Sequence, residues 1–393
     1  MYIYLVIIFF ATLVLLSVAV ALIQHLRSHL RTVQGPWLAR FTSGWYAWKV
    51  SQGSFHKVNR ELHQQYGPIV RYAPNRYSIS DLDAVKVIYG LGTSFSKSSW
   101  YSTSANPGQT TLFSEQSMTR HALERKQYQA SYSMSALIHY ENFVDNCADL
   151  FKSRLSELSA LDQAVDMRHW FQCYAFDVIG MITYGKRLGF LDRGEDVGNV
   201  ISALDDLLGY ASVVGIFPDL HRILFSLKNL MAGVKGAGRA YVVAFTQERI
   251  REVQANPKAI PLEDDEVKTQ DFLSKFLAKH STSPSTFTSF HVLAGCVSNM
   301  VAGSDTTAIS LSAVMYYLLK NPACMAKLRK EVDLFTAKGQ LSDHPTYKET
   351  QQLPYLQAVI KEALRLHPAT GLPLERVVPK GARPLLAASS LRV

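Results

Sequence analysis

Residues 302–307, AGSDTT, combine side chains that can form a polar gap inside a helix. Two small residues, Ala302 and Gly303, precede the carboxyl of Asp305 and the hydroxyl of Thr306. Glycine lets a ligand approach the backbone closely, and a threonine hydroxyl can bond back to a carbonyl one turn earlier and open the helix. The pattern indicates room for a water or a diatomic ligand, with hydrogen-bonding groups beside it. The alternative is an ordinary buried helix whose Asp is hydrogen-bonded.

A second pair of charged residues, Glu362 and Arg365, lies in PYLQAVIKEALRLHP. The stretch predicts a helix that begins after Leu353-Pro354 and stops before Pro368. An exposed pair at this spacing contributes little and is common by chance. Because the flanking residues are apolar, we expect this pair to be partly buried, where the Arg needs a further partner.

The cysteines form no metal-binding or disulfide framework that can be read from the sequence. They are far apart, with no CxxC and no Cys/His pair at metal spacing. Cys173 and Cys296 lie in apolar stretches typical of buried free thiols. We expect reduced cysteines, while the even count leaves two disulfides open. The four are Cys147, Cys173, Cys296 and Cys324.

The elements that must position these residues are mostly helices. Between about residues 117 and 366, apolar residues recur at i, i+3 and i+4. The stretch from Thr286 to Leu319 is expected to be the longest helix, and only Asp305 and His291 in it can carry charge. A second membrane span is the alternative there, but the polar middle favours a core helix. Residues 69–81 predict a short β-hairpin, so the fold class is mainly α with a small β region.

The amino-terminal segment 1–23 carries no charge. At about 1.5 Å per residue it spans roughly 35 Å, enough for a bilayer core of about 30 Å. A cleaved signal peptide is the alternative, but the segment lacks a basic start. Basic residues follow directly, so we expect a single-pass anchor with the body in the cytoplasm. A hinge at 24–50, a globular domain at 51–380 and a divergent tail at 381–393 complete the expected organisation.

Composition excludes several classes of protein. The 393 residues are 48% hydrophobic and 19% charged, which is too apolar for a disordered chain. A net charge of +9 would suit an anionic partner. The Lys and Arg residues are nevertheless scattered, with no basic cluster, so we expect no nucleic-acid binding.

AGSDTT on a long helix, followed by EALR in LPYLQAVIKEALRLHPATGLPLERVVPKG, resembles the cytochrome P-450 haem-thiolate monooxygenases, especially the membrane-anchored fungal ones. FSKSSWY, HALERKQYQASYS and YAFDVIGMITYGKRLGFL extend the resemblance over about residues 30–380. It implies a haem b cofactor, NADPH-cytochrome P-450 reductase as electron donor, and an endoplasmic reticulum membrane location. It also implies hydroxylation or demethylation of a lipophilic small molecule, such as a fungal secondary metabolite.

Carried onto this sequence, the resemblance gives Asp305 and Thr306 the role of delivering protons to iron-bound dioxygen. Ala302 and Gly303 would leave room beside the haem.

The resemblance also makes Glu362 and Arg365 a structural ion pair beneath the haem. His121 and Arg125, four residues apart, match the helix that reaches the haem propionates, and Arg376 matches another propionate contact. Cationic and donor side chains on one helical face suit the two carboxylates of the propionates. The alternative for His121 and Arg125 is that they lie on an ordinary solvated helix face.

The cysteine that ligates iron in this family lies well after the EALR helix, in a loop of the form FxxGxRxCxG. Here all four cysteines precede Glu362, and the chain ends as ARPLLAASSLRV after Gly381. We therefore expect a P-450 fold lacking its C-terminal haem-ligand portion, with no metal ligand, preceded by one transmembrane helix. A thiolate is needed for the family's oxygen chemistry, so we expect this chain to be inactive as written. The alternative to a monooxygenase is a non-catalytic membrane-anchored remnant or pseudogene product.

Overall fold

The structure is a computed structural model. It describes residues 4, 23, 30–161, 164–232, 238–255 and 271–379. Apart from Tyr4 and Ile23, the predicted anchor 1–23 lies outside the described residues, as does the predicted tail 381–393.

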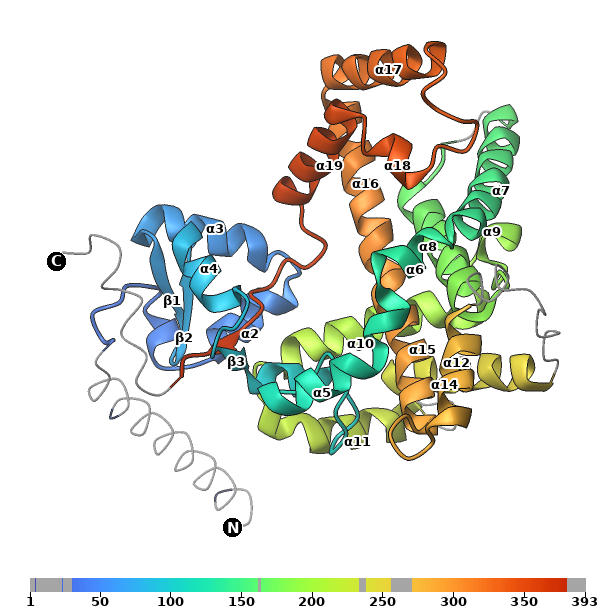
Figure 1. Ribbon diagram of the computed structural model, residues 1–393. Coiled ribbons are helices and arrows are strands. Elements are labelled where there is room, and N and C mark those ends of the chain that lie inside the picture. Colours follow the sequence, from blue (N-terminus) through green and yellow to red (C-terminus); the bar gives the residue numbers. More distant parts are fainter. Residues whose placement is uncertain are drawn as a thin grey trace. The chain divides into compact units, whose positions relative to one another are not determined.

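The described chain is mainly helical, which confirms the predicted fold class (Figure 1). The α-helices are α2 (Gly44–Ser51), α3 (Phe55–Tyr66), α4 (Leu82–Tyr89), α5 (Met118–Tyr128), α6 (Met134–Ile138), α7 (Glu141–Ala160), α8 (Met167–Tyr184), α9 (Phe190–Arg193), α10 (Val200–Val214), α11 (His221–Ala232), α12 (Arg239–Ala255), α14 (Phe272–Thr282), α15 (Ser289–Gly303), α16 (Asp305–Lys320), α17 (Pro322–Ala337), α18 (Tyr347–Thr350) and α19 (Pro354–Leu366). Short 3-10 helices are η1 (Leu38–Arg40), η2 (Ser99–Ser104), η3 (Gln129–Tyr132), η4 (Val197–Asn199) and η5 (Pro218–Leu220).

Two small antiparallel sheets accompany the helices. Strands β1 (Ile69–Ala73) and β2 (Arg76–Ile79) form the predicted hairpin. Strands β3 (Ser96–Lys97) and β4 (Arg376–Val377) form a second sheet that the sequence did not predict. Two-residue strands are too short to show an alternating pattern, so no sequence signal pointed to this pairing.

The chain divides into two compact units. Among the described residues, the first comprises 30–118, 208–225 and 371–379, and the second comprises the described parts of 119–207 and 226–370.

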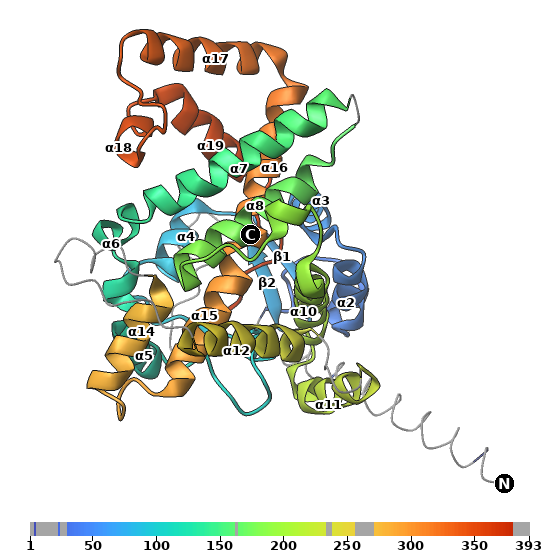
Figure 2. The same cartoon turned by 90° about the vertical axis from the view of Figure 1, so that its right-hand side faces the viewer.

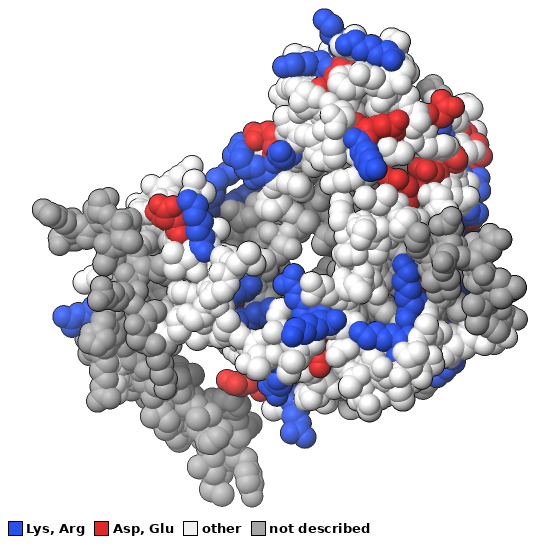
Figure 3. All heavy atoms as spheres, viewed as in Figure 1, with Lys and Arg blue, Asp and Glu red and all other residues white. Residues whose placement is uncertain are grey.

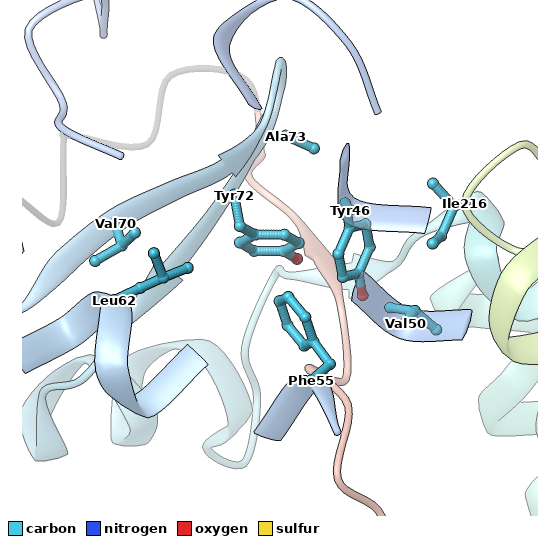
Figure 4. Close-up of a cluster of buried hydrophobic side chains, with 8 residues drawn as sticks. All are labelled: Tyr46, Val50, Phe55, Leu62, Val70, Tyr72, Ala73 and Ile216. Atoms are coloured by element: carbon cyan, nitrogen blue, oxygen red, sulfur yellow. The ribbon is translucent and has the colours of Figure 1, made fainter. Parts of the chain in front are cut away.

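The core of the first unit is built around three aromatic rings. Tyr46 lies 4.7 Å, between ring centroids, from both Phe55 and Tyr72, in edge-on contacts. Figure 4 shows these rings gathered with Val70 and Leu62. Edge-on aromatic pairs stabilise a core beyond the area that they bury. The hairpin is therefore fixed to α2 and α3 by aromatic packing.

The core of the second unit is centred on α8, which packs against α16, α7, α9 and α15. Figures 1 and 2 both show α8 beside α16. The carboxylate of Asp177 on α8 is fully buried and accepts backbone N–H bonds from Leu188 (2.7 Å), Gly189 (2.9 Å) and Leu191 (2.7 Å). Burial raises the pKa of Asp177, while these backbone bonds act to lower it. One carboxyl thus anchors the turn that follows α8.

The helix predicted from Thr286 to Leu319 is in fact two helices, α15 and α16, separated at Ser304. The prediction of one continuous helix was wrong. The Ser304 hydroxyl donates to the carbonyl of Met300 at 2.7 Å. Such back-bonding by hydroxyl side chains bends helices. Asp305 consequently occupies the first turn of α16, where the helix dipole favours a carboxylate.

One helical stretch in the described part of the chain, Val197–Val214, is long and apolar enough to cross a membrane by length and composition. It buries Ile201, Leu204 and Leu207 while Leu208 is exposed, which is typical of an amphipathic helix that turns one face toward a core.

The positive charge is distributed over the face of the molecule that Figure 3 draws. On the face drawn in Figure 3, Lys and Arg side chains stand in several separate groups. Exposed cations such as Lys86 pair locally, here with Asp83 at 2.9 Å.

Candidate active site

Asp305 is a half-buried carboxyl in the first turn of α16. The buried amide of Gln172 on α8 donates from Nε2 to its Oδ1 at 3.5 Å, a long hydrogen bond. Burial raises the pKa of Asp305, the charge of Asp205 raises it further, and Arg168 lowers it. Asp305 therefore holds a proton more readily than an exposed aspartate does.

Sequence reasoning missed Gln172. It lies 133 residues before Asp305, and nothing in its local pattern distinguishes it from another core position.

Thr306 forms the back-bond that the sequence predicted. Its hydroxyl donates to the carbonyl oxygen of Ala302 at 2.6 Å, one turn earlier. Thr306 and Ala302 are both exposed, so the hydroxyl lies on the solvent-facing side of the helix. Asp305, whose carboxyl is half-buried, directly precedes Thr306 in the sequence. The arrangement places a carboxyl with a raised pKa and a hydroxyl at one helix break.

The space beside Gly303 differs from the prediction. A methyl group on Gly303 would lie 2.7 Å from Cδ1 of Ile179 on α8. The room expected there is filled by Ile179, because the missing side chain lets α8 pack closely against α15. Ala302, by contrast, is exposed.

Glu362 and Arg365 form the predicted ion pair on α19. The Nε and Nη2 atoms of Arg365 each donate to a carboxylate oxygen at 2.7 Å. The predicted partial burial was wrong, since the side chains are 56% and 67% exposed. The physical reason is that α19 buries only Ala363, so the described residues leave the pair in solvent. Its bond to Arg365 lowers the pKa of Glu362.

His121 and Arg125 lie on α5 four residues apart, as predicted. His121 is half-buried and Arg125 is exposed. Two contacts with His291 hold α5 against α15. The Tyr128 hydroxyl donates to the carbonyl of His291 at 2.9 Å. The Nε2 atom of His291 lies 3.1 Å from Oε2 of Glu124. This positions the two candidates within the second unit.

Arg376 lies on β4 in the first unit. Its Nη1 donates to the Tyr101 hydroxyl at 2.6 Å and to the carbonyls of Leu374 (3.2 Å) and Glu375 (3.0 Å). Lys97 stands opposite it in the β3–β4 sheet. Sequence reasoning used FSKSSWY only as part of a resemblance and did not identify Lys97 or Tyr101.

The four cysteines do not fit the role of a haem-ligating thiolate. All are free thiols, and Cys147, Cys173 and Cys296 have no exposed surface. The prediction of buried thiols at Cys173 and Cys296 is therefore confirmed. Burial raises the pKa of Cys147 and of Cys173 to about 12, and raises that of Cys296 as well. An iron-ligating cysteine has to be a thiolate with an open face for a flat cofactor, which these three residues lack.

Cys324 is exposed, and the helix that carries it, α17, has no buried face. Every side chain of α17, all of them described, is exposed or half-buried. Within the described ranges, no three His, Cys, Asp or Glu side chains gather as a metal site either. An iron–thiolate bond would have to use a cysteine other than these four.

Comparisons with known proteins agree with the helical architecture. The cytochrome P450 family model matches residues 35–383. A pisatin demethylase of Fusarium vanettenii is 37% identical over 359 residues, which cover 90% of this chain and 67% of that protein. A cytochrome P450 monooxygenase of Aspergillus terreus is 36% identical over 388 residues, or 94% of this chain and 77% of the relative. The cytochrome P450 monooxygenase cicH of Emericella nidulans is 36% identical over 363 residues, or 91% and 71%. With a family model that matches most of its length and relatives at this level of identity, the chain belongs to the cytochrome P450 family.

Proposed function

We propose that the reaction associated with this protein is monooxygenation of a lipophilic small molecule, by hydroxylation or demethylation. The observation that carries the proposal is the half-buried Asp305 carboxyl at a helix break, beside the exposed hydroxyl of Thr306. Family membership supports haem chemistry, and the relative named pisatin demethylase supports demethylation as one form of it. Relatives named as fungal monooxygenases support a role in secondary metabolism.

In this proposal, Asp305 and Thr306 handle protons. Haem, when bound, supplies the oxidising chemistry in this family. Burial raises the pKa of Asp305, so its carboxyl takes up a proton more readily than an exposed aspartate does, and Gln172 orients that carboxyl through Oδ1. Thr306 can pass a proton through its hydroxyl, which is already fixed toward Ala302. We propose that this carboxyl and the neighbouring hydroxyl together deliver protons from solvent.

The remaining candidates have supporting roles in this proposal. His121, Arg125 and Arg376 supply donors for the two propionates of the porphyrin. Glu362 and Arg365 form a structural ion pair beneath it. Their bidentate geometry supports that role, because a guanidinium held in place can also take a further partner.

A second candidate function is a non-catalytic, membrane-anchored remnant. The observation that favours it is the burial of three cysteines and the exposed setting of the fourth, Cys324. We propose on this ground that the chain as written does not carry out the reaction. Both readings share the membrane anchor at 1–23, with the body facing the cytoplasm at the endoplasmic reticulum, and the monooxygenase takes electrons from NADPH-cytochrome P-450 reductase.

The two candidates are separated by comparing the chain with a chimera. The chain is fused at residue 379 to the segment of the pisatin demethylase relative in which the family carries its FxxGxRxCxG loop. Each protein is expressed with haem and reductase and given a panel of lipophilic methoxy compounds, with Asp305→Asn as the control. We expect no turnover by the chain and Asp305-dependent turnover by the chimera. Turnover by the chain would refute its inactivity, and turnover by the chimera that is indifferent to Asp305→Asn would refute the proposed role of Asp305.

A further inference from the structure

His291 contacts two helices of the second unit through its two ring nitrogens. The residue lies in the first turn of α15. Its Nδ1 atom accepts the backbone N–H of Thr288, the residue that precedes α15, at 3.0 Å. Its Nε2 atom lies 3.1 Å from Oε2 of Glu124 on α5. A single side chain therefore caps one helix and binds the other.

These contacts fix the protonation state of the imidazole. A backbone N–H can only donate, so Nδ1 carries no proton. A neutral imidazole then carries its proton on Nε2, which donates to the carboxylate of Glu124. The Thr288 hydroxyl, 2.9 Å from Nδ1, can donate there too. The observed cap thus requires a neutral His291.

A second proton on the ring has opposite effects on the two contacts. A proton on Nδ1 would face the backbone N–H of Thr288, donor against donor, so the cap is lost. The positive charge would also turn the Nε2 hydrogen bond to Glu124 into an ion pair, and hydrogen bonds between charged groups are stronger. Histidine is the side chain that ordinarily changes charge between about pH 5 and about pH 8. The ring can therefore exchange a helix cap for an ion pair as the pH falls.

The other titratable groups near the imidazole lie on α5 and α14. Tyr128 of α5 donates its hydroxyl to the carbonyl of the same histidine at 2.9 Å, and burial raises the pKa of this tyrosine, so it stays neutral. Phe287 stacks on the imidazole with ring centres 5.3 Å apart. On α14, Lys279 Nζ lies 4.9 Å from the ring centre of Phe287, and His280 Nδ1 lies 2.7 Å from its carbonyl oxygen. Among these described neighbours, Glu124 is the one anion that favours a charged ring.

We propose that His291 is a proton-controlled clasp between α5 and α15. When neutral it caps α15, and when protonated it releases the cap and pairs with Glu124. The helix α15 runs from this cap to the break before Asp305, and α5 carries His121 and Arg125. The clasp follows from its own hydrogen bonds, and only its influence on the reaction rests on the proposed function.

Hydrogen–deuterium exchange of the whole chain, without haem or substrate, tests the clasp between about pH 8 and about pH 5. Exchange at the C2 position of the imidazole, read by mass spectrometry of the peptide that contains His291, gives the pH at which the ring takes up its proton. Amide exchange in the same peptide, corrected for its intrinsic pH dependence, reports on the N–H of Thr288. We expect its protection to fall about fivefold as the ring titrates, which is the usual contribution of one helix cap. Amides of α17, which contains no histidine, should keep their corrected protection.

Two variants make the result specific to these residues. In His291→Gln, the new side chain can cap at this position but cannot titrate, so the protection should remain and lose its pH dependence. Glu124→Gln removes the anion that favours the charged ring, so the cap should be released only at a lower pH.

Three results would overturn the proposal. They are titration of the ring with no change at the Thr288 amide, no titration of the ring between about pH 5 and about pH 8, and an unchanged pH dependence in His291→Gln. Release at the same pH in Glu124→Gln would refute the pairing with Glu124. Because no measurement uses haem or turnover, these results leave the proposed function standing, and the unchanged chain alone decides the first two if a variant fails to fold.

Discussion

Ile179 on α8 occupies the position that a side chain at residue 303 would fill, with its Cδ1 only 2.7 Å from where a Gly303 methyl would stand. This contact fixes the distance between α8 and α15 just before the break that presents Asp305. The glycine in AGSDTT therefore has a packing role that its motif does not reveal.

Gly303→Ala should destabilise the chain by about 1–3 kcal/mol because it overpacks a helix contact. The loss should shrink in an Ile179→Ala background, where the methyl has room. Denaturant unfolding of the four proteins measures this coupling. Gly209→Ala on α10 is the matched control: no atom lies within 4 Å of its new methyl, so it should stabilise by about 0.5–1 kcal/mol. Equal losses from Gly303→Ala in both backgrounds would contradict the packing role.

Asp177→Asn should destabilise the second unit by about 2–3 kcal/mol, since an amide cannot accept all three buried N–H bonds. The free energy of unfolding from denaturant titration gives the value. Asp192→Asn is the control, because Asp192 is 42% exposed and pairs with Arg187 at 3.3 Å, so the change should be under about 1 kcal/mol. Similar losses of unfolding free energy in the two variants would show that the buried hydrogen bonds of Asp177 contribute no more to stability than the exposed ion pair of Asp192.

Asp305 should make stability depend on pH. Its folded pKa lies above the unfolded value of about 3.9, so the folded state binds its proton more tightly. Stability from this group is present below the unfolded pKa and is lost as pH rises through the folded pKa. Asp305→Asn should remove that loss, so the variant should become more stable relative to the parent as the pH rises above about 4, the unfolded pKa of an aspartate. Asp83→Asn, at an 87% exposed position, should leave the profile unchanged, and an unchanged profile in Asp305→Asn would refute the raised pKa.

Thiol alkylation should distinguish the cysteines. In the native chain at about pH 8, Cys324 should react, while Cys147, Cys173 and Cys296 should be protected by burial and raised pKa. Denaturant should expose all four. Peptide mass spectrometry, with Cys324→Ser as the control that abolishes native labelling, makes the assignment. Rapid native labelling of any buried cysteine would show that its helix opens.

The sequence predicted features that depend on neighbours in the chain. The hairpin around residues 73–76, the start of α19 at Pro354 and the back-bond of Thr306 all follow from local rules of turns, caps and hydroxyls. The exposure of the Glu362–Arg365 pair was not predictable in this way, because it depends on what packs against α19.

Features that depend on distant residues escaped prediction. Gln172 reaches Asp305 only after α8 and α16 have packed together. Lys97 faces Arg376 through two-residue strands from separate parts of the chain. Local pattern carries no information on such pairings, which arise from tertiary packing.

The most direct test of this account is a carbon monoxide difference spectrum of the reduced chain expressed with haem available. The account predicts no thiolate-type Soret band, because Cys147, Cys173 and Cys296 are buried thiols and Cys324 lies on an open helix. A thiolate-type band that disappears in one of the four single Cys→Ser variants would contradict it, and would identify the cysteine that ligates the iron.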